Sequence, residues 1–215
     1  MRRNPALVLV ALLLAPLALA GCGTDKPTRL YKLSPVAENA EGTSPRGVAI
    51  GVGPITLPKY LDRPQIVTGV TSNQMSQGNF DQWGGELNDN MTRVLAANLS
   101  NLLGTDRVSL YPWKDQAPIE YQVTLDVTQF EQEASGKTVL SAFWSIVNPN
   151  TGKVLTMRRS TYRDATTAAS TAGSTATTAD STGADPYDAV AAAMSRDLGA
   201  LSRDIARTIT ALHGS

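Results

Sequence analysis

The run Leu19-Ala20-Gly21-Cys22 constrains this chain more than any other feature, because it ends the long apolar stretch near the N-terminus and holds the only cysteine in the sequence. A basic start, Met1-Arg2-Arg3, precedes the apolar run from Ala6 to Ala18. This order is typical of a cleaved secretory signal peptide, and the apolar run is short for a bilayer span. A lone cysteine has no partner for a disulfide within the chain, so we expect the hydrophobic core to stabilise the fold.

Cys22 stands where a bacterial lipobox places its acylated cysteine, and Leu-Ala-Gly-Cys resembles that motif. We therefore predict that residues 1–21 are a lipoprotein signal peptide and that Cys22 is the lipid attachment site. It would carry an S-diacylglycerol and an N-acyl group such as palmitate, and we expect no other cofactor. The alternative is an ordinary cleaved signal with an incidental cysteine. Several acyl chains, at about 0.8 kcal/mol for each buried methylene, make a durable membrane anchor.

The length and charge of the remaining chain fit one domain that does not bind nucleic acid. Removal of residues 1–21 from the 215 leaves 194, enough for one domain with its own core. Without Arg2 and Arg3 the chain has 17 basic and 19 acidic residues, a formal charge of −2. This balance does not favour nucleic-acid binding, which needs a basic surplus. We expect a tether over residues 22–45 with a short strand at 30–33, and a single domain over residues 46–212.

Residue periodicity predicts strands, a helix and more strands in the first part of that domain. Residues 47–53 alternate apolar and small side chains, which predicts a strand whose glycines allow close backbone approach. Apolar residues at steps of three and four predict a helix over 83–103, with Gly104 as its C-cap. We expect a short strand at 107–113, ended by Pro112, and longer strands at 121–130, 138–147 and 153–163, with a hairpin turn at 148–152.

A second long helix is predicted near the C-terminus. Asp185 and Pro186 suit its first positions, and apolar residues recur at steps of three and four from Tyr187 to Leu212. This seam fits a helix lying across a sheet or a coiled coil. Residues 165–184, rich in Ala, Thr, Ser and Gly, predict a mobile loop. The predicted fold class is α+β, with a largely antiparallel sheet and two amphipathic helices packed on one face.

The sequence shows no set of residues suited to catalysis. The one histidine, His213, lies near the end of the sequence, and no Cys/His cluster with zinc spacing occurs. Asp62, Asp81 and Glu86 are not brought together by their spacing, so we interpret them as turn and surface residues. We predict no catalytic, metal-binding or cofactor-binding residue, and therefore no enzyme.

Two proline-bounded segments instead predict a protein contact. Aromatic side chains beside rigid prolines suit an interface. The candidate contact residues are Leu57, Pro58, Tyr60, Leu61, Asp62, Arg63, Tyr111, Pro112 and Trp113. In the alternative interpretation, Tyr60 and Trp113 close the end of the core. We expect Trp83 in the core.

The segment over residues 52–67, Val-Gly-Pro-Ile-Thr-Leu-Pro-Lys-Tyr-Leu-Asp-Arg-Pro-Gln-Ile-Val, resembles the PqiC/YmbA family of ABC-type transport auxiliary lipoproteins. These proteins are also called membrane integrity-associated transporter subunits. The similarity extends through Trp83, residues 94–99, 108–113 and 121–127, and the final helix, roughly residues 30–212. The Ala/Thr-rich stretch 165–183 is longer than is usual in the family.

The resemblance implies a non-enzymatic, periplasm-facing lipoprotein subunit of an MCE-type (mammalian-cell-entry) intermembrane lipid transport system. Such a subunit would dock the MCE assembly to the outer membrane and support envelope integrity. The implied partners are a PqiB-like MCE-domain protein and its inner-membrane partner, and a homo-oligomeric ring fits the family. The residue after the lipid-bearing cysteine is Gly23, whereas an aspartate at this position would favour retention in the inner membrane. The absence of aspartate therefore favours the outer membrane. The alternatives are a lipid-binding carrier lipoprotein with an apolar cavity and an envelope hydrolase.

Overall fold

The computed structural model describes residues 26–36, 47–113, 118–166 and 185–214. The signal peptide, Cys22 and residues 167–184 of the predicted loop lie outside this part. The elements in chain order are β1 (Arg29–Tyr31), β2 (Ile50–Thr56), β3 (Gln65–Gly69), β4 (Met75–Trp83), α2 (Leu87–Leu103), β5 (Val108–Leu110), β6 (Tyr121–Gln132), β7 (Lys137–Asn148), β8 (Lys153–Ala165) and α3 (Pro186–His213).

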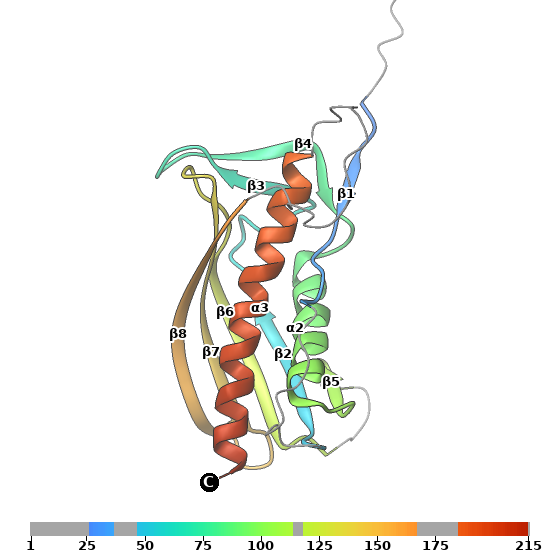
Figure 1. Ribbon diagram of the computed structural model, residues 1–215, viewed down its shortest axis with the longest axis vertical. Helices are drawn as coiled ribbons and strands as arrows, with labels where there is room; N and C mark the ends of the chain where they lie inside the picture. The colour runs from blue at the N-terminus through green and yellow to red at the C-terminus, as the bar shows by residue number, and fades with distance from the viewer. Residues whose placement is uncertain (1–25, 37–46, 114–117, 167–184, 215) are drawn as a thin grey trace, which may run out of the picture.

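The eight strands form one mixed sheet that curls around the two helices (Figure 1). The long strand β6 lies at the centre of the sheet. It pairs with β7 along one side and with β2 and β3 along the other. The predicted unit of three antiparallel strands over residues 121–163 is confirmed, because β6, β7 and β8 form two long antiparallel ladders. β8 lies at one edge of the sheet.

The prediction of a largely antiparallel sheet is wrong. In the described part of the chain, four of the seven strand pairings are parallel: β1 with β4, β2 with β5, β2 with β6, and β3 with β6. Apolar alternation along a strand reports which face is buried and carries no information on the direction of its neighbours. The direction follows from the connections, since α2 carries the chain back so that β5 runs parallel to β2.

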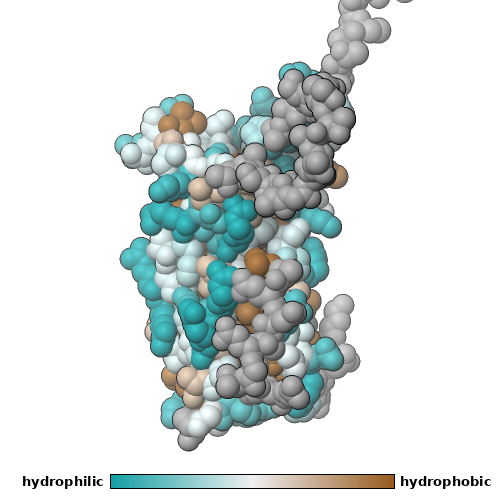
Figure 2. All heavy atoms as spheres, in the orientation of Figure 1, coloured by the Kyte–Doolittle hydropathy of each residue, from teal (hydrophilic) through white to brown (hydrophobic). Residues whose placement is uncertain are grey.

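Both helices pack on one face of the sheet and against each other, as predicted (Figure 1). α3 lies across β6, β7 and β8, and α2 lies over β2 and β5. Leu95 and Leu99 of α2 and Leu198, Leu201 and Ile205 of α3 are fully buried in a single core cluster with the sheet. The surface over α3 and β8 is mainly hydrophilic (Figure 2), so the apolar seam of α3 is used against the sheet and α2.

The helix caps follow the sequence, but the first helix starts later than predicted. Gly104 ends α2 in the left-handed conformation at φ +58°, and the Asp185 side chain accepts a hydrogen bond from the backbone N–H of Tyr187 at the start of α3. α2 begins at Leu87, because Trp83 is the last residue of β4 and its N–H donates to the carbonyl of Pro64. Trp83 is 4% exposed, which confirms its place in the core.

The segment around β1 joins the sheet to the N-terminus of α3. The Tyr31 hydroxyl lies 2.9 Å from Asp81 Oδ1 and 2.5 Å from Asp185 Oδ2, and Arg29 forms ion pairs with both carboxylates. Asp81 is only 6% exposed, so its interpretation as a surface residue is wrong. Burial of a carboxylate costs much free energy unless the group is paired with a positive charge and hydrogen-bonded, and Asp81 has both kinds of partner.

Candidate protein-contact site

The first predicted contact segment is a tight turn between β2 and β3. The N–H of Leu61 donates to the carbonyl of Pro58 at 2.9 Å, and that of Asp62 to the carbonyl of Lys59 at 3.2 Å. The Leu61 side chain is 3% exposed and belongs to the core cluster, so it anchors the turn to the core. Asp62 and Arg63 are exposed. The turn therefore presents charged side chains on a buried apolar base.

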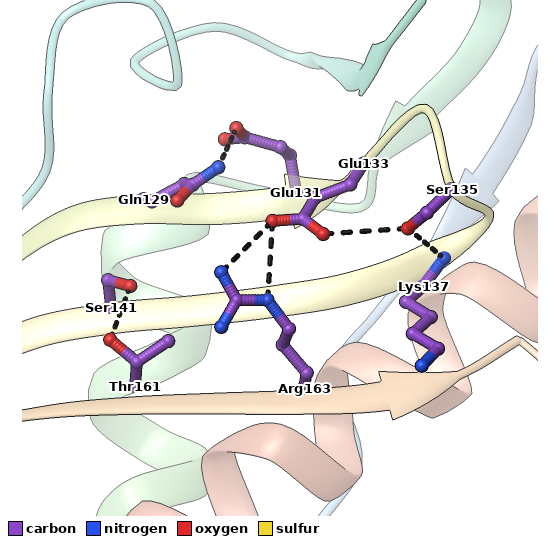
Figure 3. A network of polar contacts seen from close by, with 8 residues as sticks. All are labelled: Gln129, Glu131, Glu133, Ser135, Lys137, Ser141, Thr161 and Arg163. Atoms are coloured by element: carbon purple, nitrogen blue, oxygen red, sulfur yellow. Dashed lines mark hydrogen bonds and ion pairs between the residues drawn. The ribbon is translucent and has the colours of Figure 1, made fainter. Parts of the chain in front are cut away.

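Tyr60 fastens this turn to the sheet. Its hydroxyl donates to Glu131 Oε2 of β6 at 2.5 Å. Gln129 donates to the other carboxylate oxygen of Glu131 at 2.9 Å, as Figure 3 shows. Glu131 is 3% exposed, and both of its oxygens are thus satisfied. Burial, together with the hydrogen bond to Glu131, raises the pKa of Tyr60 well above its ordinary value. Tyr60 packs against the core cluster, as the alternative interpretation of this residue expects.

The second predicted segment packs on the glycines of β2. A Cβ atom on Gly51 would lie 2.6 Å from the Trp113 ring, and one on Gly53 would lie 2.7 Å from Tyr111 Cβ. Gly53 also has φ +112°, a conformation that other residues rarely adopt. The prediction that these glycines allow close approach is confirmed. Tyr111 remains 50% exposed, and its ring meets that of Trp113 edge to face at 5.6 Å.

Two adjoining grooves bring both segments to the start of α2. The first, of about 750 Å³, is lined by Gly53, Pro54, Ile55, Glu86, Asn88, Asp89, Thr92, Arg93, Val108, Ser109, Leu110, Tyr111, Pro112 and Trp113. The second, of about 510 Å³, is lined by Leu57, Leu61, Asp62, Arg63, Pro64, Trp83, Gly85, Glu86, Leu87 and Asn88. Glu86 and Asn88 belong to both grooves. Pro58 and Tyr60 line neither groove.

Residues 31–206 match the family model described as the ABC-type transport auxiliary lipoprotein component. The chain belongs to this family. It is similar to the intermembrane transport lipoprotein PqiC of Escherichia coli (strain K12) and to that of Shigella flexneri, with 26% identity over 133 residues, which cover 61% of this chain and 70% of each relative. The expected relationship to PqiC is thus confirmed.

Solved structures share the fold of this auxiliary lipoprotein. Protein XCC0632 from Xanthomonas campestris has a TM-score of 0.65 and 14% identity, covering 86% of this chain and 98% of its own. A second, uncharacterized protein has a TM-score of 0.60 and 19% identity, covering 86% and 99%. At these identities the likeness shows the fold alone.

The start of α2 contributes site residues that the sequence did not indicate. The Asn88 side chain donates to the carbonyl of Ile55 at 2.6 Å and so fixes the helix start to the end of β2. Exposed Glu86, Asp89 and Arg93 give the groove walls mixed charge, with Asp89 and Arg93 4.0 Å apart. In the sequence, this polar first turn looks like any solvent-exposed helix start. The tertiary fold alone places it between the two predicted segments.

The groove walls carry kinds of side chain that are common at protein interfaces. The walls combine half-exposed aromatic and proline side chains with a rim of charged groups. Asp62 and Glu86 line the second groove together. Within the described ranges there is no group of three or more His, Cys, Asp or Glu residues that could hold a metal ion. None of the described helices is long and apolar enough to cross a membrane.

Proposed function

We propose that this auxiliary lipoprotein is a non-enzymatic subunit of an MCE-type intermembrane lipid transport system, anchored in the outer membrane through lipid on Cys22 and facing the periplasm. The observation that carries the proposal is the family match over residues 31–206, together with relatives named intermembrane transport lipoproteins. Its partners are then a PqiB-like MCE-domain protein and the inner-membrane protein of the same system. In this role the lipoprotein docks the MCE assembly and supports envelope integrity.

The surface around the start of α2 is the proposed docking site. We define this contact surface as Asp62, Arg63, Glu86, Arg93, Tyr111, Pro112 and Trp113. Tyr111 supports the assignment because it is half exposed, rigidly seated on Gly53 and flanked by the first groove. Aromatic side chains in such positions contribute a large share of binding energy at protein interfaces.

Co-purification of the full-length lipoprotein with the MCE-domain protein of the same organism, in mild detergent, tests the role. We expect the two to purify together, and Tyr111→Ala to weaken the contact. Met157→Ala is the matched control, because Met157 is 67% exposed on β8, a strand that does not line either groove. Failure of the wild-type proteins to associate would overturn the proposed role, whereas binding that Tyr111→Ala leaves unchanged would overturn the docking site alone.

The purified full-length lipoprotein also tests the alternative that the protein is a lipid carrier. A carrier needs an apolar cavity, but a continuous cluster of buried side chains occupies the space between sheet and helices in the described part of the fold. We therefore expect no stoichiometric phospholipid in mass spectrometry of the purified lipoprotein beyond the covalent lipid on Cys22. Stoichiometric bound lipid without an MCE partner would favour the carrier.

A further inference from the structure

In the described part of the chain, strand β5 leaves one edge of the sheet unpaired beside the first groove. β5 pairs with β2 in parallel, and no other strand of the described chain pairs with it. Free strand edges carry N–H and C=O groups that readily pair with another chain, and proteins usually shield them with charge, bulges or covering segments. The side chains on β5 itself, Val108, Ser109 and Leu110, carry no charge. This edge is therefore chemically open to strand addition.

The hydrogen bonds between β5 and β2 show which backbone groups of β5 are left unpaired. The N–H of Ile50 donates to the carbonyl of Arg107, and the N–H of Tyr111 donates to the carbonyl of Val52. Residues 107, 109 and 111 thus direct their backbone groups toward β2, because alternate residues of a strand bond to the same side. The N–H and C=O groups of Val108 and Leu110 consequently point away from the sheet.

The first groove runs along this edge. Val108 and Leu110 lie on one face of β5 and Ser109 lies on the other, yet all three line the groove. The groove therefore borders the edge of the strand and not one of its faces. The same groove is lined by Glu86, the N-cap of α2, and by the first two turns of that helix, including Arg93. Leu110 is 41% exposed and provides an apolar contact beside the open backbone groups.

We propose that the β5 edge, which lies beside the contact surface, binds the partner by accepting an extended segment of the partner protein as an added strand. This inference rests on the proposed docking role. The segment would hydrogen-bond to the backbone of Val108 and Leu110 and place an apolar side chain against Leu110 and Tyr111. Glu86 is exposed in the same groove, and because Asp89 and Arg93 there pair with each other, its charge favours a basic side chain in the bound segment. Backbone pairing supplies affinity in strand addition, while pockets for alternate side chains supply selectivity.

Hydrogen exchange at single-residue resolution tests the pairing directly. The full-length lipoprotein is compared alone and in complex with the MCE-domain protein. We expect the exchange of the Val108 and Leu110 amides to slow by about tenfold or more in the complex, as new hydrogen bonds form. The Ser109 amide, which already faces β2, serves as the internal control and changes less. A complex in which neither edge amide is protected would overturn the inference.

Proline substitution provides a second, independent test. Leu110→Pro removes an outward N–H, which an edge strand tolerates, and Leu110→Ala removes the same side chain but keeps the N–H. We expect Leu110→Pro to weaken binding of the MCE-domain protein about tenfold more than Leu110→Ala, the effect of one lost hydrogen bond. Circular dichroism of both variants would check that they are folded. Hydrogen exchange on the wild type decides the matter if Leu110→Pro does not fold.

The outcomes separate this inference from the function on which it rests. If the partner binds and Tyr111→Ala weakens it while the two Leu110 variants behave alike, the docking surface stands and strand addition is refuted. If the wild-type lipoprotein does not bind the MCE-domain protein at all, the proposed function and the strand inference are both refuted.

Discussion

The buried carboxyl of Asp197 makes the stability of this fold depend on pH in a predictable direction. Asp197 lies on the sheet-facing side of α3, is 2% exposed, and accepts a hydrogen bond at 2.7 Å from Thr138 of β7. Burial raises the pKa of Asp197 to about 6 from its ordinary 3.8. The Thr138 hydrogen bond and the charges of Arg196 and Arg163 oppose this rise, and Asp164 adds to it.

The sign and size of the effect follow from linkage. The folded state holds the proton more tightly than the unfolded state, so the contribution to stability is full below about pH 4 and is lost as pH rises through about 6. At about 1.4 kcal/mol for each pH unit, ionisation of the buried carboxyl lowers the free energy of unfolding by about 3 kcal/mol at pH 8. An amide in its place has no charge to bury and retains an oxygen that can accept from Thr138.

We therefore predict that Asp197→Asn is more stable than the wild type at pH 8 by up to about 3 kcal/mol, and that the advantage shrinks toward zero at pH 4. Urea denaturation of the protein without residues 1–22 across this range measures the difference. Asp106→Asn, a change at an exposed aspartate, is the matched control and should show no such trend. Wild-type and Asp197→Asn stability curves that run parallel with pH would refute the reasoning.

Three further predictions concern packing and the anchor. Gly51→Ala should cost about 1–3 kcal/mol because its methyl group would meet the Trp113 ring, and urea denaturation should show most of this cost relieved in a Trp113→Ala background. Gly199→Ala should destabilise α3 through a clash with Val36, and Val36→Ala, which removes the nearer Cγ2 contact but leaves Cβ at 3.2 Å, should relieve most of the loss; an equal loss in both backgrounds would contradict the close approach. Cys22→Ala should abolish incorporation of labelled palmitate into the protein, and incorporation that persists in the variant would contradict the lipid anchor on Cys22.

Local order in the chain was predictable from the sequence wherever the decisive interactions are themselves local. The caps at Gly104 and Asp185, the hairpin between β7 and β8 and the apolar seam of α3 depend on residues a few positions apart. The glycines of β2 also indicated a close approach, although the pattern did not say that Tyr111 and Trp113 make it. Trp83 fits the helical spacing of Leu87, yet Gly84 and Gly85 separate it from the helix.

The sequence by itself determined the α+β class, the two amphipathic helices and two of the segments that line the candidate site, because side-chain polarity and turn chemistry act over short distances. Only the tertiary structure decided the parallel pairing of β2 with β5 and β6, the burial of Asp81 against Tyr31 and Arg29, and the position of Glu86 and Arg93 beside Tyr111. Each of these joins residues far apart in the chain. Such contacts depend on how whole elements pack, and the polarity of one segment does not report which distant backbone will lie beside it.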